Sequence, residues 1–312
     1  MRPFAARATV LFLSAALLTA CSSEPGDKGG DNAKEPAIGT IPKLLSAADL
    51  SYPLDGYAAT AEQRRKLDHA QSRVTTACMA RFGFTYTLPQ VPSSGRSSNE
   101  GHYGLTDAAA AARYGYTPNR GVAPPAKPIA PKLSASGELA LNGPDYKGAQ
   151  PMSLEESEAK DSGKTLGGKK VPIGGCIREG YLKIYAPKKG AVDVMFVTNM
   201  GMDAFSRAHD DSRVSAAIKA WSDCMAEKGY KTDDPVSPQQ DLGLDANTYG
   251  SPRAIAAARQ DIACKERANL VGIWYTVETA YQKRNMEQNA EALNQAKAEL
   301  DERLKLAATL AG

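Results

Sequence analysis

Apolar residues recur at helical spacing in several stretches of this chain. From Leu67 to Cys78 they return every three to four residues, a period that places them on one face of an amphipathic helix. Thr60 followed by Gln63 has the capping-box spacing that marks a helix start. The pattern therefore predicts a helix from Thr60 with Cys78 on its buried face.

Two further helices are predicted in the second half of the chain. The first begins at Asp211 or Ser212 and has a broad apolar stripe. The second begins at Ser251 and Pro252, a serine cap followed by a proline in the first turn. No proline follows Pro252, so helix is expected nearly to the C-terminus, with a bend at Gly272.

Two of these helices end in the same motif. Residues 78–84 read CMARFGF, and residues 224–230 read CMAEKGY. Gly83 and Gly229 are placed to adopt the left-handed conformation that ends a helix, and the aromatic residue after each glycine then folds back onto the helix. The motif predicts two helix ends of the same geometry, each beside a cysteine.

The stretches between the helices are rich in Pro, Gly and Ser and have no period. Residues 88–103 and 117–150 are the longest of them, separated by a short alanine-rich helix within 106–115. The run 124–131 contains overlapping PxxP spacings, for which an extended linker is a simpler interpretation than a docking segment. Residues 192–197 suit a strand or a helix, and we favour a helix because their surroundings are helical.

Composition supports a helical fold. Hydrophobic residues make up 42% of the 312 residues but aromatic residues only 7%, so the core relies on Ala, Leu and Val, which favours closely packed helices. The expected fold is mainly α: a disulfide-stapled helical domain with long Pro/Gly-rich loops and a long C-terminal helix. The formal charge of +3 comes without a clustered basic excess, which argues against nucleic acid as a partner.

Residues 1–20 have the organisation of a signal peptide. Arg2 and Arg7 precede an apolar stretch of roughly 13 residues, which is too short to span a bilayer. The stretch ends in LTAC at residues 18–21, which resembles a bacterial lipobox. The resemblance implies diacylglyceryl transfer to Cys21, cleavage before it and anchoring by acyl chains. The alternative is an ordinary signal peptide followed by a chance cysteine.

Lipidation of Cys21 also explains the cysteine count. Five cysteines is an odd number for an exported protein, and removing Cys21 leaves four in an oxidising compartment. Four cysteines allow three pairings, and we predict one disulfide for each motif. A turn-rich loop over 233–250 is long enough to return the next helix alongside the second motif. The predicted disulfides are Cys78–Cys176 and Cys224–Cys264.

Domain boundaries follow from these elements. Residues 21–45 hold almost nothing to bury and are expected to be a flexible tether. The stapled helical domain spans 46–285, with halves at about 46–190 and 191–285, and residues 286–312 form a C-terminal helical extension. The apolar positions of this extension repeat every seven residues, which suits a coiled coil through self-association, packing back onto the domain, or a helix that frays. These positions are Met286, Leu293, Leu300 and Ala307.

Candidate catalytic or metal-binding residues are few. His69 falls on the polar side of its helix, His102 lies in a Gly/Ser-rich loop, and His209 precedes two aspartates just before a helix. Aspartates at that position are expected as cap and dipole partners. Residues 245–250 begin like a calcium loop but fail at its fifth and twelfth positions. With the common hydrolase, zinc, phosphate and dinucleotide motifs also absent, we expect no catalytic, metal-binding or cofactor-binding residues.

Several short motifs occur in a distinctive order. They include CM with GF at 78–84, YGLTD at 103–107, GGC at 174–176, CM with GY at 224–230 and DIAC at 261–264. In this order they resemble a group of uncharacterised secreted lipoproteins of Streptomyces-type actinobacteria. No activity, catalytic residue or ligand comes with the resemblance.

The sequence therefore leads to a hypothesis about location and a general role. We expect a lipid-anchored protein at the outer face of the cytoplasmic membrane, acting as a non-enzymatic module that binds an envelope protein or a cell-wall ligand. The alternative is an envelope hydrolase with an unrecognised active site that uses His209 and nearby acids. The C-terminal helix is the candidate face for self-association.

Overall fold

The computed structural model describes residues 34–89, 99–118 and 131–311. The contacts of the chain divide it into two units, Met1–Glu35 and Pro36–Gly312. Every helix and strand of the described residues lies in the second unit. The predicted lipidation site Cys21 and the PxxP run at 124–131 fall outside the described residues, except for Pro131.

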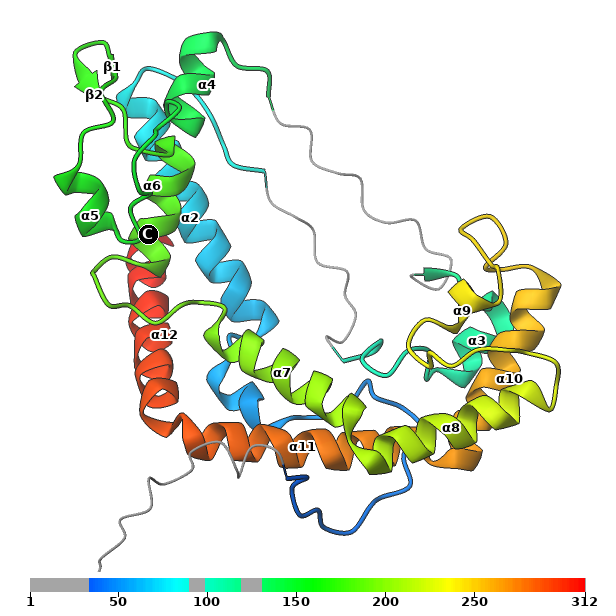
Figure 1. The fold of residues 1–312 in the computed structure, drawn as a ribbon. Coiled ribbons are helices and arrows are strands. Elements are labelled where there is room, and N and C mark those ends of the chain that lie inside the picture. The colour runs from blue at the N-terminus through cyan, green and yellow to red at the C-terminus, as the bar shows by residue number, and fades with distance from the viewer. Residues whose placement is uncertain (1–33, 90–98, 119–130, 312) are drawn as a thin grey trace, which may run out of the picture. The chain divides into compact units, whose positions relative to one another are not determined.

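The protein is mainly α-helical, as expected, and it has two disulfides and a long C-terminal helix (Figure 1). A short antiparallel hairpin with two residues in each strand, in which Thr165 is opposite Lys170, was not predicted. The elements are η1 (Pro53–Tyr57), α2 (Ala61–Arg81), α3 (Ala108–Tyr114), α4 (Ala135–Asn142), α5 (Leu154–Ala159), β1 (Thr165–Leu166), β2 (Lys169–Lys170), α6 (Gly175–Tyr185), α7 (Phe196–Asp210), α8 (Ser212–Ala226), α9 (Pro238–Asp241), α10 (Pro252–Ala268), α11 (Leu270–Gln288) and α12 (Ala290–Ala311).

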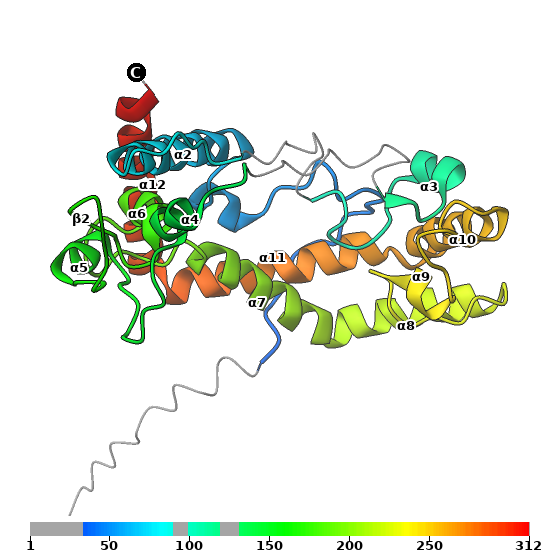
Figure 2. The ribbon, with the colours of Figure 1, turned by 90° about the horizontal axis from the view of Figure 1, so that it is seen from above.

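Helices α2, α6 and α12 pack against one another (Figures 1 and 2). The seven-residue apolar repeat of the C-terminal helix is covered by the rest of the chain, since Leu293, Leu300 and Ala307 are buried and Met286 is partly buried. In the structure this face packs back onto the domain. The buried core of the three helices comprises Leu67, Ala70, Val74, Ile184, Leu300 and Ala307.

A second group consists of α7, α8, α10 and α11, with α3 packed on α10. Its core surrounds Trp221 and Trp274, both fully buried. Because α3 precedes residue 190 and α12 returns to α2, neither packing group is a continuous half of the chain. The expected halves, 46–190 and 191–285, therefore differ from the observed packing.

The two cysteine motifs form helix ends of the same geometry, as predicted. Gly83 and Gly229 have φ angles of +84° and +81°, where only glycine avoids a steric penalty. In the first motif the amide of Phe84 donates to the carbonyl of Met79, and that of Gly83 to Ala80. The second motif repeats both bonds one for one, from Tyr230 to Met225 and from Gly229 to Ala226. This is the Schellman pattern, which satisfies carbonyls that a helix end leaves free. The aromatic residues Phe84 and Tyr230 pack against buried clusters beside their cysteines.

Residues 36–45, here called the strap, lie against α11 rather than forming part of a tether. The amide of Leu44 donates to Oδ1 of Asn269 at 3.3 Å, and Nδ2 of Asn269 donates to the carbonyl of Pro42 at 3.0 Å. A Cβ atom on Gly272 would clash with that same carbonyl. The tether expected over 21–45 therefore extends too far, because its last ten residues belong to the folded unit.

The long helical stretch after Pro252 is interrupted at two asparagines. Asn269 has a left-handed conformation, with φ of +48°, and separates α10 from α11. Asn289 separates α11 from α12. The helix is therefore interrupted at Asn269, three residues before the position predicted for the bend. Gly272 instead allows the close approach of the strap. Within the described residues, none of the helices combines the length and apolar character needed to cross a bilayer.

Candidate functional site

Both predicted disulfides are present. Cys78 on α2 is bonded to Cys176 on α6, and Cys224 on α8 is bonded to Cys264 on α10. Their Cα–Cα distances are 5.5 and 5.6 Å, within the usual range for disulfides. All four cysteines are buried, which favours a structural role over thiol exchange.

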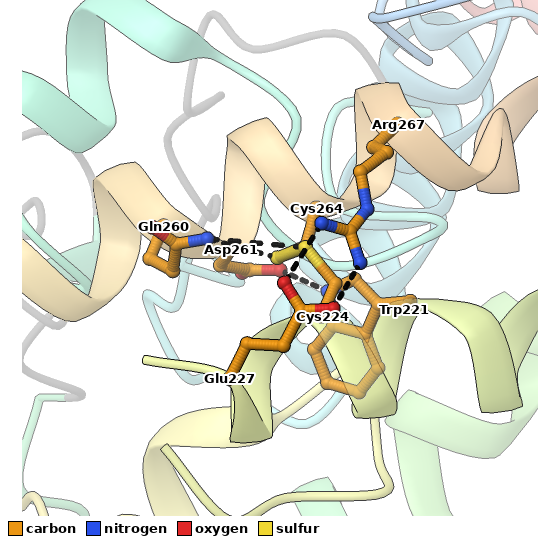
Figure 3. The surroundings of a disulfide bond; sticks show 7 residues. All are labelled: Trp221, Cys224, Glu227, Gln260, Asp261, Cys264 and Arg267. Carbon is orange, nitrogen blue, oxygen red and sulfur yellow. Dashed lines mark hydrogen bonds and ion pairs between the residues drawn. A yellow bond between two sulfur atoms is a disulfide. The ribbon is translucent and has the colours of Figure 1, made fainter. Parts of the chain in front are cut away.

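Hydrogen bonds and an ion pair flank the second disulfide (Figure 3). Three residues before the two cysteines, Nε1 of Trp221 donates to Oδ1 of Asp261 at 2.9 Å. Three residues after them, the guanidinium of Arg267 binds the carboxylate of Glu227 at 2.7 and 2.9 Å. Helices α8 and α10 are therefore joined at three successive levels.

The first disulfide has an ion pair at the same offset. Arg81 and Glu179 each follow their cysteine by three residues, and their side chains form two hydrogen bonds of 2.6 and 2.7 Å. The order of charges is reversed relative to the second disulfide. The two motifs thus share the helix end, the disulfide and an ion pair three residues further on.

Asp261 and Lys265 form a buried ion pair beside the second disulfide. Nζ of Lys265 lies 3.2 Å from Oδ1 of Asp261 and donates to the carbonyl of Leu105 at 3.0 Å. Burial raises the pKa of Asp261 and lowers that of Lys265, because desolvation disfavours each charged form. Trp221 donates to the same carboxylate. The pair therefore holds α10 against α8 through Asp261 and against the loop at Leu105 through Lys265, which is a structural role.

The histidines considered for chemistry are placed as expected in two cases. His69 is exposed on α2. His209 is about half exposed, at 52%, and its Nδ1 atom lies 3.0 Å from a carboxylate oxygen of the more exposed Asp210. Asp211 caps α8 by accepting the amide of Arg213 at 3.0 Å. The capping interpretation of this segment is therefore confirmed for Asp211.

His102 makes an interaction that the sequence did not reveal. Its Nε2 atom lies 3.0 and 2.9 Å from the two carboxylate oxygens of Glu278 on α11. Glu278 also accepts hydrogen bonds from the hydroxyl of Tyr103, at 2.8 Å, and from the side-chain amide of Gln282, at 3.1 Å. The side chain of Glu278 is only 1% exposed. A buried carboxylate with donors on both oxygens ties the loop of His102 to α11.

Tyrosines extend this network towards the N-terminus. The hydroxyl of Tyr52 donates to that of Tyr103 at 2.9 Å. Burial, together with the charge of Glu278, raises the pKa of both hydroxyls, so both remain donors at neutral pH. The signal in the sequence was Glu278 itself, a charged residue between the apolar positions of Val277 and Tyr281, where carboxylates are rare unless paired.

The calcium-like segment is a turn. The carboxylate oxygen Oδ1 of Asp245 accepts hydrogen bonds from the amides of Asn247 and Thr248 and from the hydroxyl of Thr248. These are the local bonds of an aspartate turn, which supports the interpretation of 245–250 as a lead into the Ser251 cap of α10. Among residues 34–89, 99–118 and 131–311, no cluster of His, Cys, Asp and Glu has the arrangement of a metal site.

A cavity of about 370 Å³ lies where α2, α6 and α12 meet η1 and the start of α7. We call it the tyrosine cavity, because Tyr57, Tyr181 and Tyr185 line it together with aliphatic residues. Its volume falls in the roughly 300–1,000 Å³ range of small-molecule sites, which combine apolar walls with a few polar groups. The buried side chains of Leu67 and Leu300 contribute to its walls.

Several polar side chains line the tyrosine cavity among its aliphatic residues, and two of them, Tyr185 and Arg303, have partners within the domain. The hydroxyl of Tyr185 donates to Oδ1 of Asp68 at 3.4 Å. Burial and the charge of Asp68 raise the pKa of Tyr185 to about 12, so this hydroxyl stays protonated at neutral pH. Arg303 donates to the carbonyl of Val192 at 3.1 Å and to Glu299 at 3.0 Å. The cavity is therefore formed by residues distant in sequence, none of which was a predicted site residue.

No family model, curated protein or solved structure matches this chain.

Proposed function

We propose that the protein is a lipid-anchored, extracytoplasmic module at the outer face of the cytoplasmic membrane, where it binds an envelope ligand without catalysing a reaction. The observation that supports this most directly is the pairing of four of the five cysteines. Two buried disulfides suit an oxidising compartment. They leave Cys21, at the end of the lipobox-like sequence, as the cysteine available for lipid.

The tyrosine cavity is the best candidate for the binding site. It joins aliphatic walls to three tyrosines and two arginines, the mixture that fixes the position and orientation of a small ligand. The disulfide Cys78–Cys176 joins α2 to α6, and both helices contribute to its lining. The site is thus held on rigid elements, which lowers the entropy lost on binding.

One observation favours the alternative, an envelope hydrolase. Glu278 holds the imidazole of His102 by both carboxylate oxygens, and an acid that orients a histidine is one part of a hydrolytic triad. Among the described residues, however, no hydrogen bond joins His102 to a serine, threonine or cysteine side chain. Binding is therefore the preferred function. Hydrolysis of purified cell wall that His102→Gln abolishes, with the protein still folded, would reverse this order.

Lipid labelling and fractionation test the proposal. Cells expressing the wild-type chain or Cys21→Ser are labelled with a palmitate analogue and separated into membrane, soluble and medium fractions. We expect label and membrane association only for the wild type, with the folded domain accessible to protease added outside the cell. Wild-type protein found unlabelled in the cytosol would contradict the proposal.

A further inference from the structure

The charged groups of the tyrosine cavity balance one another. Two arginines and two aspartates line it, namely Arg64, Arg303, Asp68 and Asp193. Arg303 is also paired with Glu299, and Asp68 accepts the hydroxyl of Tyr185. A charged ligand loses hydration when it enters, and the lining has no net opposite charge that would compensate for this loss. The lining therefore suits an uncharged ligand.

The polar groups can nevertheless make several hydrogen bonds. Carboxylates accept, guanidinium groups donate, and the hydroxyls of Tyr57 and Tyr181 can do either. An uncharged ligand that uses them must itself carry several donors and acceptors. A ligand that is only apolar, such as an acyl chain, would leave these groups unpaired at a cost in free energy.

Two tyrosine rings pack against each other in the cavity. Tyr181 and Tyr185 lie on successive turns of α6, with ring centroids 5.0 Å apart and ring planes inclined by 34°. Both residues are partly exposed, and both line the cavity. The negative faces of aromatic rings attract groups with partial positive charge, such as the C–H bonds on one face of a sugar ring, while the sugar hydroxyls remain free for polar partners.

From the balanced charge, the donor and acceptor set and the pair of tyrosine rings, we infer that the tyrosine cavity binds an uncharged saccharide, with a sugar ring stacked on the Tyr181–Tyr185 pair. Asp68 and Asp193 accept hydrogen bonds from its hydroxyl groups, and Arg64 donates hydrogen bonds to them. This inference rests on the proposed binding function and names the chemical class of its ligand.

Calorimetric titration of the mature protein in phosphocholine micelles tests the inference. The probes are tri-N-acetylchitotriose as the uncharged saccharide, inorganic phosphate as an anion and trialanine as a peptide. We expect saturable binding of the saccharide that weakens by about tenfold in Tyr181→Ala and in Tyr185→Ala. Tyr185→Phe keeps the ring and is expected to retain most of the affinity. Tyr146→Ala changes a tyrosine outside the cavity and serves as the control.

Circular dichroism and the melting temperature establish that each variant is folded, so that loss of binding is not loss of structure. Three results would overturn the inference: no saccharide binding at concentrations on the order of 10 mM, equal affinity in the folded alanine variants, or saturable binding of phosphate or trialanine in place of the saccharide. Binding of trialanine in the cavity would reject the saccharide while supporting the proposed binding function. Cytosolic localisation, by contrast, would reject the proposed function itself.

Discussion

Glu227 and Arg267 form an ion pair, and each stands three residues after one of the two cysteines of the same disulfide. Arg81 and Glu179 repeat this relationship at the other disulfide with the charges exchanged. The third position after the motif cysteine is thus Arg in one copy and Glu in the other, and the partner helix supplies the opposite charge each time. The two disulfide units therefore share the same ion-pair position despite their different surroundings.

The covalent bond is expected to contribute far more than the ion pair at each unit. In the chain-entropy model, loops of 98 and 40 residues give about 4.7 and about 4 kcal/mol of stabilisation. We therefore expect the double variant Cys224→Ala/Cys264→Ala to lower the unfolding free energy by up to about 4 kcal/mol. Urea unfolding followed by circular dichroism measures this change.

Glu227→Ala is the matched comparison, since its side chain and that of Arg267 are more than half exposed. Surface ion pairs contribute little because water screens them. A loss of stability in Glu227→Ala as large as that in the cysteine double variant would contradict this assignment.

Replacing either motif glycine by alanine should destabilise the protein through the backbone alone. Gly83 and Gly229 have positive φ, and a Cβ atom at either position would meet no other atom within 4 Å. The expected cost is about 1–2 kcal/mol for each variant, the penalty of a left-handed L-residue. Urea unfolding of Gly83→Ala and Gly229→Ala tests this value.

Gly201→Ala is the control for these variants. Gly201 lies inside α7, also has open space around its Cα hydrogens and has no positive φ. Alanine is favoured over glycine there by about 0.5–1 kcal/mol. Stabilisation at Gly201 with destabilisation at the two motif positions is the predicted pattern, and the same sign at all three would refute the helix-end assignment.

Gly272→Ala is expected to release the strap from α11. A methyl group at this position clashes with the carbonyl of Pro42, which also accepts the hydrogen bond from Asn269. Hydrogen exchange followed by mass spectrometry should show faster exchange of the Leu44 amide, with little change in α2. Unchanged protection of Leu44 would mean that the strap does not depend on close approach at Gly272.

Asp211 should make the stability depend on pH in the acid range. Burial raises its pKa, but hydrogen bonds from Arg213 and that residue's charge outweigh burial and hold the pKa below its usual value. A carboxyl with a lowered folded-state pKa stabilises above its unfolded pKa of about 3.9, and the stabilisation is lost as the pH falls through the folded-state pKa. Asp211→Asn keeps a capping side chain but loses the charge.

We expect the wild type to exceed Asp211→Asn in unfolding free energy by on the order of 1.5–3 kcal/mol at pH 7, and the difference to vanish at strongly acid pH. Urea unfolding across pH 2–7 measures it. Asp210→Asn, at an exposed neighbour, is the control and should show little pH-dependent difference. A difference for Asp211→Asn that is constant with pH would refute the role of its charge.

Local signals in the sequence were sufficient for the helix ends and caps. Thr60 with Gln63, Asp211, Ser251 and the two motif glycines all occupy the predicted positions. Such positions depend on hydrogen bonds between residues a few places apart, so a short stretch contains the necessary information. Helix α4 carried the same signals, Ser134 as cap and Gly143 at its end, but its Pro- and Gly-rich flanks favoured a loop.

Contacts between distant segments could not be predicted in this way. Glu278 and His102 are 176 residues apart, and the strap meets α11 more than 220 residues further along the chain. Half of the strap's residues are Ala, Ile or Leu, and Ile38 and Leu44 pack against the core. The tether prediction grouped them with the polar stretch before them, whereas contacts at Asn269 and Gly272 hold the strap in place. The tyrosine cavity likewise requires η1, α2, α6 and α12 to be assembled before its lining exists.

We propose that Cys21 carries lipid while the other four cysteines hold two helical units together outside the cytoplasm. Peptide mapping of the purified mature protein by mass spectrometry without reduction, after alkylation of free thiols, tests this most directly. We expect Cys78–Cys176 and Cys224–Cys264 peptides, no alkylated cysteine and an N-terminal Cys21 peptide with the mass of a diacylglyceryl modification. Alkylated cysteines, a Cys78–Cys224 peptide or an unmodified Cys21 would contradict it.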